Sequence, residues 1–549
     1  MLFFYIFLLV CIVATLIYKS KRYLHMLQQN LYNENNRYLK WVFRNSKQFL
    51  DLDLLAILGS CIGVFVLYDL ENLSVLLIGG LGILFLVLAY LWRSRLHSDQ
   101  NKKPLVITKR VKRLIVTTSI LYLIPTLFLF VNNTDRQFVW AMITLLSIMV
   151  VLNPFIVFLA NIINYPIERL VYHFYKHKAQ SKLKSMSNLK IIGITGSYGK
   201  TSSKNILGDI LNIKYNALPT PRNLNTYNGL IMTVNNHLTK FNDIFIAEMG
   251  AYVKGEIKGL CKLVKPKYGI LTRIGTAHLE SFGSEQNIID GKWITNDKYG
   301  VIHKFELIES LPSDGFAVLN GDDPKQVSYK LKNKVRVIWI GIDNSNVDVR
   351  ATNIKCSSKG TEFDVLFHDD KQKYHFETKL LGDHNVYNIL AGLAFGYEFG
   401  ISISDLQQAV KGVRPVEHRL ELKKLGNFYQ IDDAYNSNPV GAENALKVLG
   451  MMPGVKVVVT PGMIELGDKE DEYNKKFGEQ ISGVADYVVL VGERHTKPIK
   501  EGLLAKGFDK DKIVVLNDVR AAYPFIGQLA NKKEVYALFE NDLPDTYNE

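Results

Sequence analysis

The stretch GITGSYGKTSS, which begins at residue 193, contains the residue types that bind phosphate groups. It follows a strand-like run and leads into a helix-like run. Gly196 and Gly199 allow backbone N–H groups to turn toward an anion at the N-terminus of that helix. Lys200 would reach the terminal phosphates of a nucleotide, and the Thr201 hydroxyl would ligate magnesium. Ile194 replaces the first glycine of the general pattern, so a simple Gly/Ser turn is the alternative, but the order strand, loop, Lys-Thr, helix favours phosphate binding.

Two further residues have side chains suited to metal binding. Glu248 ends the strand-like run IFIAE, and the C-terminal ends of strands in an open α/β sheet are where ligand-binding residues gather. Carboxylate oxygens are the ligands that magnesium prefers. His278 lies in the run AHLE. A solvated strand-end acid and a structural histidine are the alternatives, because a lone residue of either type does not define a metal site.

These residues lie in a region whose pattern indicates an α/β fold. From about residue 188, short strand-like runs alternate with helical stretches, which predicts a mostly parallel sheet. A second such set begins near Phe428, and the two sets join around Gly412–Pro415. We therefore expect two α/β domains, over residues 187–412 and 413–549.

The first third of the chain has a different composition, with five apolar stretches that approach the ~20 residues needed to cross a bilayer. They are Leu2–Tyr18, Leu54–Tyr68, Ser74–Trp92, Leu114–Val131 and Phe138–Ala160. Lys and Arg are concentrated in the connections 19–53 and 93–113 and nearly absent from the other two. Because positive connections stay in the cytoplasm, this alternation predicts five crossings. Residues 1–186 are expected to form a multi-pass α-helical region of the inner cell membrane. The N-terminus would lie outside, and the α/β domains would lie in the cytoplasm.

The net charge of +13 is explained by the same region, since much of the excess lies beside the predicted membrane surface. The α/β part has no basic stripe interleaved with aromatic residues, so a nucleic-acid partner is not expected. The four cysteines have neither metal nor redox spacing, and they are assigned no role.

The phosphate-binding stretch and the runs that follow it resemble a known family. T-G-S-x-G-K-T-S resembles the loop of the Mur ligases, which use ATP to form amide bonds in cell-wall precursors. The runs PTPRNLNTYNGL, FIAEMGA, TRIGTAHLESFGS, LNGDDP, LGDHNVYNILAGLA, EHRLE and DDAYNSNP follow in family order. The runs AHLESFGS, DDAYNSNP and GMIELG are most similar to the branch that adds D-alanyl-D-alanine to the UDP-muramoyl tripeptide. The resemblance covers about half of the chain and implies a central ATPase domain followed by a Rossmann-like domain.

The resemblance also implies roles for individual residues. ATP would be bound by Thr195, Gly196, Ser197, Tyr198, Gly199, Lys200, Thr201, Asn385, Asn388, Arg419 and Asp433. Magnesium would be bound by Thr201, Glu248 and His278, and the carboxylate substrate by Asn225 and Thr226. Asn385 could equally lie in a helix N-cap. Arg419 and Asp433 belong to the C-terminal domain, so that domain would close over ATP.

The family uses a lysine carbamylated by CO2 as a further metal ligand, and two lysines compete for this role. Lys292 has the shortest family spacing from His278, whereas Lys304 fits the pattern K-x-E-L better. Lys304 is preferred, which makes residues 288–302 an insertion; a solvated lysine is the alternative for either residue. The predicted catalytic residues are Lys200, His278 and Lys304.

The implied activity is ATP-dependent ligation of an amine to a carboxylate through an acyl phosphate. The predicted substrates are a cell-envelope precursor and an amino acid or dipeptide, and the lipid bilayer is a predicted partner. Two departures leave the substrate open: the membrane region replaces the usual UDP-sugar domain, and the C-terminus lacks a K-G-S-R-like run. A synthase of the poly-γ-glutamate type and a catalytically silent nucleotide-binding membrane scaffold are the alternatives.

Overall fold

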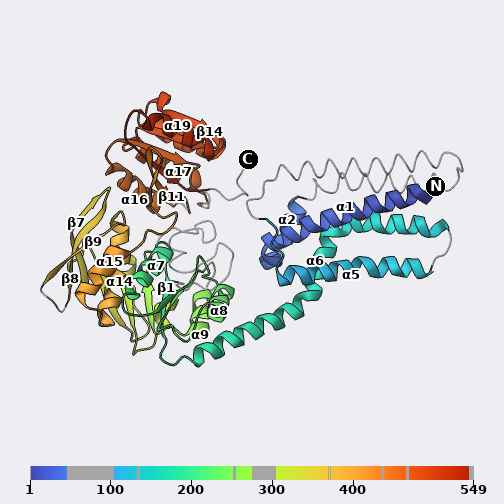
Figure 1. The fold of residues 1–549 in the computed structure, drawn as a ribbon, viewed down its shortest axis with the longest axis horizontal. Coiled ribbons are helices and arrows are strands. Elements are labelled where there is room, and N and C mark those ends of the chain that lie inside the picture. Colours follow the sequence, from blue (N-terminus) through green and yellow to red (C-terminus); the bar gives the residue numbers. More distant parts are fainter. Residues whose placement is uncertain are drawn as a thin grey trace. The chain divides into compact units, whose positions relative to one another are not determined.

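The computed structural model describes residues 2–45, 104–132, 136–251, 255–274, 304–368, 370, 372–435, 438–464, 466 and 469–542. The chain divides into two compact units, Met1–Phe174 and Tyr175–Glu549 (Figure 1).

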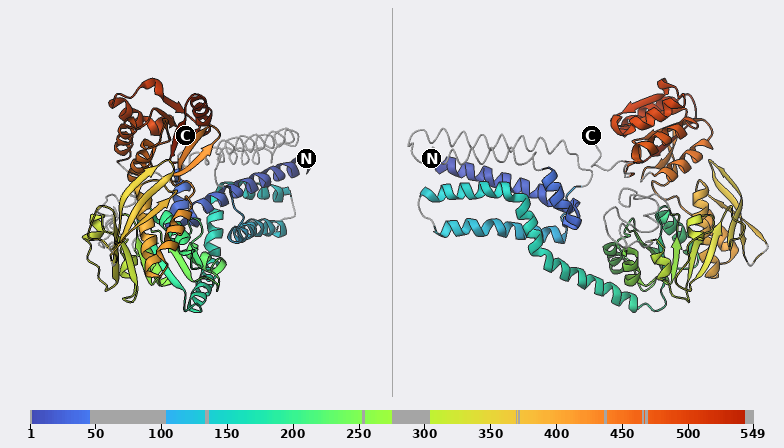
Figure 2. Two further views of the ribbon diagram at one scale, coloured as in Figure 1. Left: turned by 60° about the vertical axis from the view of Figure 1, so that its left-hand side comes forward. Right: turned by 180° about the vertical axis from the view of Figure 1, so that it is seen from behind.

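The described part of the first unit is helical. Its elements are α1 (Leu2–Gln29), η1 (Leu31–Asn36), α2 (Arg37–Arg44), α5 (Lys109–Asn132) and α6 (Arg136–Lys184), of which α6 continues into the second unit. Two apolar clusters hold α1, α2, α5 and α6 together. Ile12 of α1 packs with Ile143 of α6 in one cluster, and Leu27 of α1 with Leu114 of α5 in the other. The clusters explain why the helices lie alongside one another (Figure 2).

Two helices in the described part are long and apolar enough to cross a membrane, over Lys109–Val131 and Ala141–Lys184. They contain the predicted segment Leu114–Val131 and most of Phe138–Ala160, and the segment Leu2–Tyr18 lies within α1. The segments Leu54–Tyr68 and Ser74–Trp92 lie outside the described residues. Five crossings, and the orientation that follows from them, therefore stay a prediction.

The second unit begins with a nine-stranded sheet in the order β2-β3-β1-β4-β5-β6-β7-β8-β9. Its strands are β1 (Lys190–Thr195), β2 (Ala217–Pro219), β3 (Ile244–Glu248), β4 (Tyr268–Leu271), β5 (Phe316–Asn320), β6 (Arg336–Gly341), β7 (Val349–Ser357), β8 (Gly360–Phe367) and β9 (Lys373–Thr378). The strands from β2 to β7 pair in parallel, as expected. The antiparallel extension β7-β8-β9 was not anticipated; its strands alternate buried and exposed residues, as one-sided antiparallel strands do.

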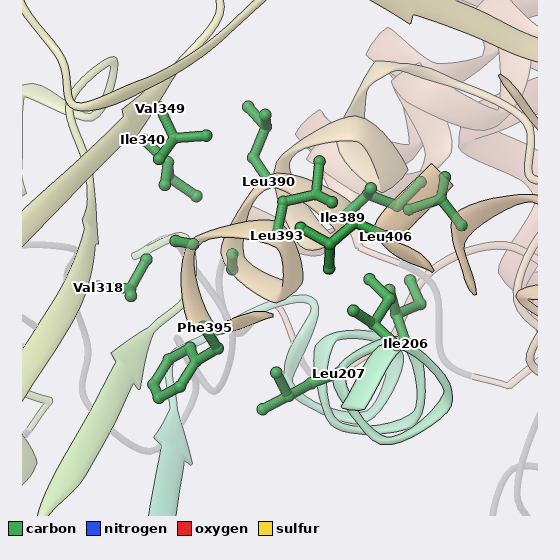
Figure 3. Packing of buried hydrophobic residues seen from close by; sticks show 14 of the residues in the cluster. Ile206, Leu207, Val318, Ile340, Val349, Ile389, Leu390, Leu393, Phe395 and Leu406 are labelled. Carbon is green, nitrogen blue, oxygen red and sulfur yellow. The ribbon is translucent and has the colours of Figure 1, made fainter. Parts of the chain in front are cut away.

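Helices α7 and α14 cover the centre of this sheet. The helices of the domain are α7 (Lys200–Leu211), α8 (Tyr227–Asn236), α9 (Glu256–Val264), α12 (Glu306–Glu309), α13 (Pro324–Val327), α14 (Asp383–Glu398) and α15 (Ile403–Gly412). Figure 3 shows Ile206 and Leu207 of α7 near Leu393 and Phe395 of α14, with Val318 of β5 beside them. This buried cluster fixes the starts of α7 and α14, where the candidate site lies.

A second sheet, in the order β10-β11-β15-β12-β13-β14, forms the C-terminal domain. Its strands are β10 (Glu421–Leu425), β11 (Phe428–Asp433), β12 (Val455–Thr460), β13 (Tyr487–Val491), β14 (Ile513–Leu516) and β15 (Val535–Glu540). Its helices are α16 (Pro439–Gly450), α17 (Glu470–Ser482), α18 (Glu493–Ala505), η3 (Lys510–Lys512), η4 (Val519–Ala521) and α19 (Ala522–Ala530). The second set of strand-like runs, expected from about Phe428, forms β11 to β15. The predicted domain limits remain predictions; α6 ends at Lys184 and α15 at Gly412.

Candidate active site

The loop from Thr195 to Thr201, called the phosphate loop below, connects β1 to α7 and needs both of its glycines. Gly196 has φ +149°, and a Cβ there would lie 1.9 Å from the Thr272 hydroxyl oxygen. Gly199 has φ +81° and precedes the first residue of α7. Thr272 donates a hydrogen bond to the Tyr198 carbonyl oxygen at 2.6 Å, which holds the loop against the end of β4. The loop is therefore a tightly supported backbone turn at a helix N-terminus.

The cation of this loop is Lys200. Its Nζ donates hydrogen bonds to the carbonyl oxygens of Gly196 and Ser197, at 2.7 and 3.2 Å. Burial lowers the pKa of Lys200 to about 8, Glu248 opposes this shift, and Arg419 adds to it. An anion bound in the loop would replace the carbonyl contacts and favour the charged form.

The Glu248 carboxylate is surrounded by donors. It accepts hydrogen bonds from the Thr201 hydroxyl at 3.2 and 3.3 Å and from Asn225 Nδ2 at 3.0 Å, and it pairs with Lys204 Nζ at 2.9 Å. Glu248 is only 1% exposed. Register explains the contact with Thr201, because Glu248 lies opposite Ile194, just before the phosphate loop. Thr201 and Glu248, predicted as metal ligands, and Asn225, predicted to face the substrate, are thus brought together.

Lys204 is a site residue that the sequence reasoning missed. It is fully buried and also donates to the Arg222 carbonyl oxygen at 2.5 Å. It therefore links α7, the end of β3 and the segment that leads to Asn225. The spacing from Lys200 could have predicted this role. Residues four apart in a helix share one face, so Lys204 lies on the same face of α7 as Lys200.

Lys304 is buried, being 6% exposed, and lies close enough to Lys200 to interact with it electrostatically. Burial lowers its pKa to about 7; the charge of Lys200 adds to the shift, and Glu256 and Glu306 oppose it. The competing Lys292 and the predicted ligand His278 lie outside the described residues. Across the described ranges, no group of three or more His, Cys, Asp or Glu side chains could hold a metal ion.

The C-terminal domain contributes Arg419 and Asp433. The Arg419 guanidinium lies 4.2 Å from the centre of the Tyr435 ring, and the Tyr435 hydroxyl accepts a hydrogen bond from Asn223 Nδ2 at 3.3 Å. Burial lowers the pKa of Arg419, although Asp433 and Glu248 oppose the shift. Burial raises the pKa of Asp433 to about 6, and Arg419 opposes that shift. Arg419 is therefore held among acidic groups of both domains.

A cavity of about 530 Å³ lies beside the phosphate loop and is lined by both domains. Its lining includes Tyr198, Gly199, Ser202, Thr272, His384, Asn388, Arg419, Asp433 and Asn438. Its volume is in the range of sites that bind small ligands.

Comparisons with known proteins agree with this geometry. The family model described as "Mur ligase middle domain" matches residues 194–396, and the model "Mur ligase, glutamate ligase domain" matches residues 418–539. The UDP-N-acetylmuramoyl-tripeptide–D-alanyl-D-alanine ligase of Bacillus subtilis is 32% identical over 329 residues, which is 59% of this chain and 67% of that protein. The chain belongs to the Mur ligase family. Its members are ATP-dependent ligases that form amide bonds, and this chain is of the MurF-like branch.

Other Mur ligases are similar to this chain at comparable identity and coverage. The enzyme of the same name from Escherichia coli is 31% identical over 56% of this chain and 65% of its own length. Among solved structures, MurF from Acinetobacter baumannii has a TM-score of 0.58 at 26% identity and covers 67% of this chain and 77% of that one. MurF from Thermotoga maritima in complex with ADP has a TM-score of 0.58 at 25% identity and covers 67% and 80%. The chain thus spans about half to two thirds of the length of the curated Mur ligases it matches.

The two asparagines that the Mur ligase resemblance assigns to ATP binding differ in position. Asn388 lines the cavity, and its Oδ1 accepts a 2.6 Å hydrogen bond from Ser203. Asn385 is buried, and its Nδ2 donates to the Leu381 carbonyl oxygen. Neither caps α14, whose N-cap is Gly382. His384, not assigned from the sequence, lines the cavity; burial lowers its pKa to about 4, so its ring is neutral near pH 7.

Thr226, assigned to the carboxylate substrate with Asn225, has a local role in the structure. Its hydroxyl accepts a hydrogen bond from the Gly229 N–H and caps α8. Asn225 instead contacts Glu248, and its carbonyl oxygen accepts from the Gly250 N–H. Of the two residues, Asn225 therefore lies at the site, and Thr226 supports the helix beside it.

Proposed function

We propose that this chain uses ATP to join a carboxylate of a cell-envelope precursor to the amine of an amino acid or a dipeptide. The observation that carries the proposal is the convergence of Lys200, Thr201, Glu248 and Lys304 with Arg419, which comes from the other α/β domain. A nucleotide scaffold without catalysis would need the phosphate loop but not the buried Glu248 and Lys304.

Cations are needed because two anions, the substrate carboxylate and the γ-phosphate of ATP, must meet. Lys200 reaches the phosphate from the loop, and Arg419 adds a second positive charge from the C-terminal domain. Transfer of the γ-phosphoryl group to the carboxylate gives an acyl phosphate and ADP. The free amine then attacks the acyl carbon and loses a proton as the amide forms, and phosphate leaves with the electrons of the acyl C–O bond and takes up that proton.

Thr201 and Glu248 fit a magnesium ion. Their oxygens lie 3.2 and 3.3 Å apart, close to the ~3 Å expected between neighbouring ligands at 2.0–2.1 Å in an octahedral shell. Magnesium would supply positive charge that stabilises the phosphates during transfer. Lys204 would keep its pairing with one Glu248 oxygen and leave the other for the metal.

Lys304 is suited to carbamylation. Attack on CO2 requires the uncharged amine, and a pKa of about 7 makes that form abundant at neutral pH. The resulting carbamate would be an anion near Lys200. The buried position of Lys304 supports the assignment made from the K-x-E-L pattern, and Lys292 is the competing residue.

The acceptor is proposed to be held at the membrane. The curated relatives are named for adding D-alanyl-D-alanine to a UDP-N-acetylmuramoyl tripeptide, but residues 1–193 precede both family matches here. Among its described residues that region contains two helices suited to span a bilayer, and basic residues gather at the N-terminal end of α5. A lipid-linked precursor at the cytoplasmic face of the inner membrane is the substrate that this architecture favours.

The test compares precursor pools in cells that carry the normal protein, Lys200→Ala or the control Lys533→Ala, which changes an exposed lysine of the C-terminal domain. Lipid-linked and nucleotide-linked precursors are measured by mass spectrometry. We expect a precursor that is lighter by one amino-acid or dipeptide residue in Lys200→Ala cells only. The mass difference identifies the amine. Whether the lipid-linked or the nucleotide-linked precursor changes identifies the acceptor.

Two outcomes would contradict the proposal. Identical pools, with the variant present at the normal level, would favour the nucleotide-binding scaffold. Loss of a polymer of repeating acidic residues, with unchanged precursors, would favour a ligase of the poly-γ-glutamate type.

A further inference from the structure

Helix α6 carries an exposed apolar stripe beyond the length needed to cross a bilayer. The stripe consists of Ile163, Ile167, Leu170 and Phe174, whose spacings of four, three and four residues place them on one helical face. Their side chains are 46, 48, 71 and 64% exposed. Exposed apolar side chains in a row on one helix mark a surface that meets an apolar partner.

The other side of this helix segment is already occupied. Asn161, Asn164 and Glu168 of α6 form hydrogen bonds to Arg110, Thr117 and Arg113 of α5, respectively. These α6 residues lie on a different face from the stripe, because they are offset from it by roughly a third of a helical turn on average. The stripe therefore points away from α5.

The depth of the stripe follows from α5. The basic residues of α5 are at its N-terminal end, and one of them, Arg113, pairs with Glu168 of α6 at 2.7 Å. Such a pair belongs at the level where the hydrocarbon ends and water begins. Ile167 and Leu170 flank Glu168 in the sequence, so they lie near that level.

The stripe also continues the lipid-facing side of the candidate span. Leu152 and Leu159 are 45 and 46% exposed, and they precede Ile163 by eleven and four residues on the same face. Pro154 and Pro166 lie within α6, and the helix changes direction along its length (Figures 1 and 2). A bent helix can leave the core of a bilayer and follow its surface.

We propose that residues 163–178 of α6 lie in the boundary between headgroups and acyl chains of an anionic bilayer. The stripe enters the acyl region, and Arg169, His173, His177 and Lys178 lie among the lipid phosphates, whereas Lys176 lies over the Tyr227 ring of α8. The acidic residue of this segment, Glu168, is neutralised by Arg113. Basic and apolar residues combined in one helix are typical of helices that bind anionic membrane surfaces. The inference rests on the proposed membrane attachment, but not on the ligase activity.

The test uses the full-length protein with its native cysteines replaced and one spin label introduced at a time. The labelled positions are Leu170 in the stripe, Arg169 beside it on another face, and Leu152 in the candidate span. The protein is placed in vesicles of phosphatidylcholine and phosphatidylglycerol in equal parts. Collision of each label with oxygen, which dissolves in acyl chains, is compared with collision with a water-soluble nickel chelate.

We expect the label at Leu170 to resemble that at Leu152, with oxygen collisions dominant, and the label at Arg169 to meet the nickel chelate at least threefold more often. Equal nickel access at Leu170 and Arg169 would overturn the inference. Shielding of Leu170 from both reagents would also overturn it, because protein would then cover the stripe. Nickel access at Leu152 would instead refute the membrane attachment on which the inference rests.

The role of charge is tested by changing the lipid. In vesicles of phosphatidylcholine alone, we expect the oxygen-to-nickel ratio at Leu170 to fall at least twofold while the ratio at Leu152 stays constant. An unchanged ratio at Leu170 would refute the anionic specificity.

Discussion

At the scale of single residues, the buried Glu248 decides what its neighbours must be. Its carboxylate is 1% exposed and is stabilised by Lys204, Thr201 and Asn225. A charge in this position is tolerated only with partners, because removing one member of a buried pair leaves the other uncompensated. The same partners keep the carboxylate beside Thr201, where magnesium is proposed to bind.

Lys204→Met tests this pairing. We expect it to lower the free energy of unfolding by about 3 kcal/mol, because Glu248 is left buried without its nearest cation. The measurement is denaturant unfolding of the full-length protein in detergent. The double variant Lys204→Met/Glu248→Leu should recover most of the loss, since neither charge of the Lys204–Glu248 pair is then left without its partner. A double variant as unstable as the single one would contradict this reading.

The lowered pKa of Lys304 predicts a pH-dependent requirement for CO2. The group is mainly the free amine above a pKa of about 7 and mainly the ammonium ion below it. At fixed dissolved CO2, the concentration that half-restores activity to CO2-depleted enzyme should be about tenfold higher at pH 6 than at pH 8. Ligation rates across a CO2 series at each pH give this value.

The control for this prediction is Lys304→Arg, whose guanidinium keeps its proton. It should be inactive and unresponsive to CO2 at both pH values. An identical CO2 requirement at pH 6 and pH 8 would show that another group, such as Lys292, carries the response.

At the scale of elements, the phosphate loop depends on close packing against the end of β4. Gly196 has both a conformation that favours glycine and a neighbour 1.9 Å from where a Cβ would lie. Thr272 is that neighbour, and its hydroxyl also holds the Tyr198 carbonyl. Any side chain at residue 196 must therefore displace the contact that shapes the loop.

Gly196→Ala should weaken ATP binding at least tenfold and lower the melting temperature by several degrees. Gly507→Ala is the matched control, because Gly507 also has positive φ, +77°, but no atom within 4 Å of an added Cβ. Gly507→Ala should lower the free energy of unfolding by only ~1 kcal/mol, because of the backbone strain at positive φ, and it should bind ATP normally. Calorimetric titration with ATP distinguishes them, and equal ATP affinity in both variants would refute the packing argument.

At the scale of the whole molecule, the site is completed by two domains. Arg419 and Tyr435 belong to the C-terminal domain, whereas Asn223 and Glu248 belong to the middle domain. A charge supplied from a second domain acts when the domains are together, which couples substrate binding to closure.

Arg419→Met should therefore lower kcat for ligation by at least about 100-fold, the size of effect known for loss of one electrostatic group from a transition state. Binding of ADP should change less than tenfold, because the phosphate loop is intact. Tyr435→Phe, which removes the hydroxyl bonded to Asn223 and keeps the ring under Arg419, should reduce kcat less than tenfold. Equal losses in the two variants would contradict a separate role for the Arg419 charge.

The phosphate loop, Glu248 and the parallel sheet could be predicted from the sequence because each depends on residues close together in the chain. Glycines before Lys200 and an acid at the end of a strand-like run are short-range patterns, and they predicted the phosphate loop and Glu248. Strand-like runs separated by helical stretches likewise predicted a mostly parallel sheet, because the pattern of each run depends on the residues within it; the order of the strands comes from the structure. The charge of the connections, a local property too, predicts the membrane orientation.

Tertiary structure decided which of these residues meet. Lys204 became a site residue because α7 packs beside β3, and Thr226 became a helix cap because α8 begins there. The low pKa of Lys304 arises from burial beside Lys200, more than a hundred residues earlier in the chain, and the exposure of the α6 stripe depends on which face α5 occupies. The sequence by itself determined the chemical groups and the elements that carry them; packing between distant segments decided their partners, because burial and distance are properties of the folded chain.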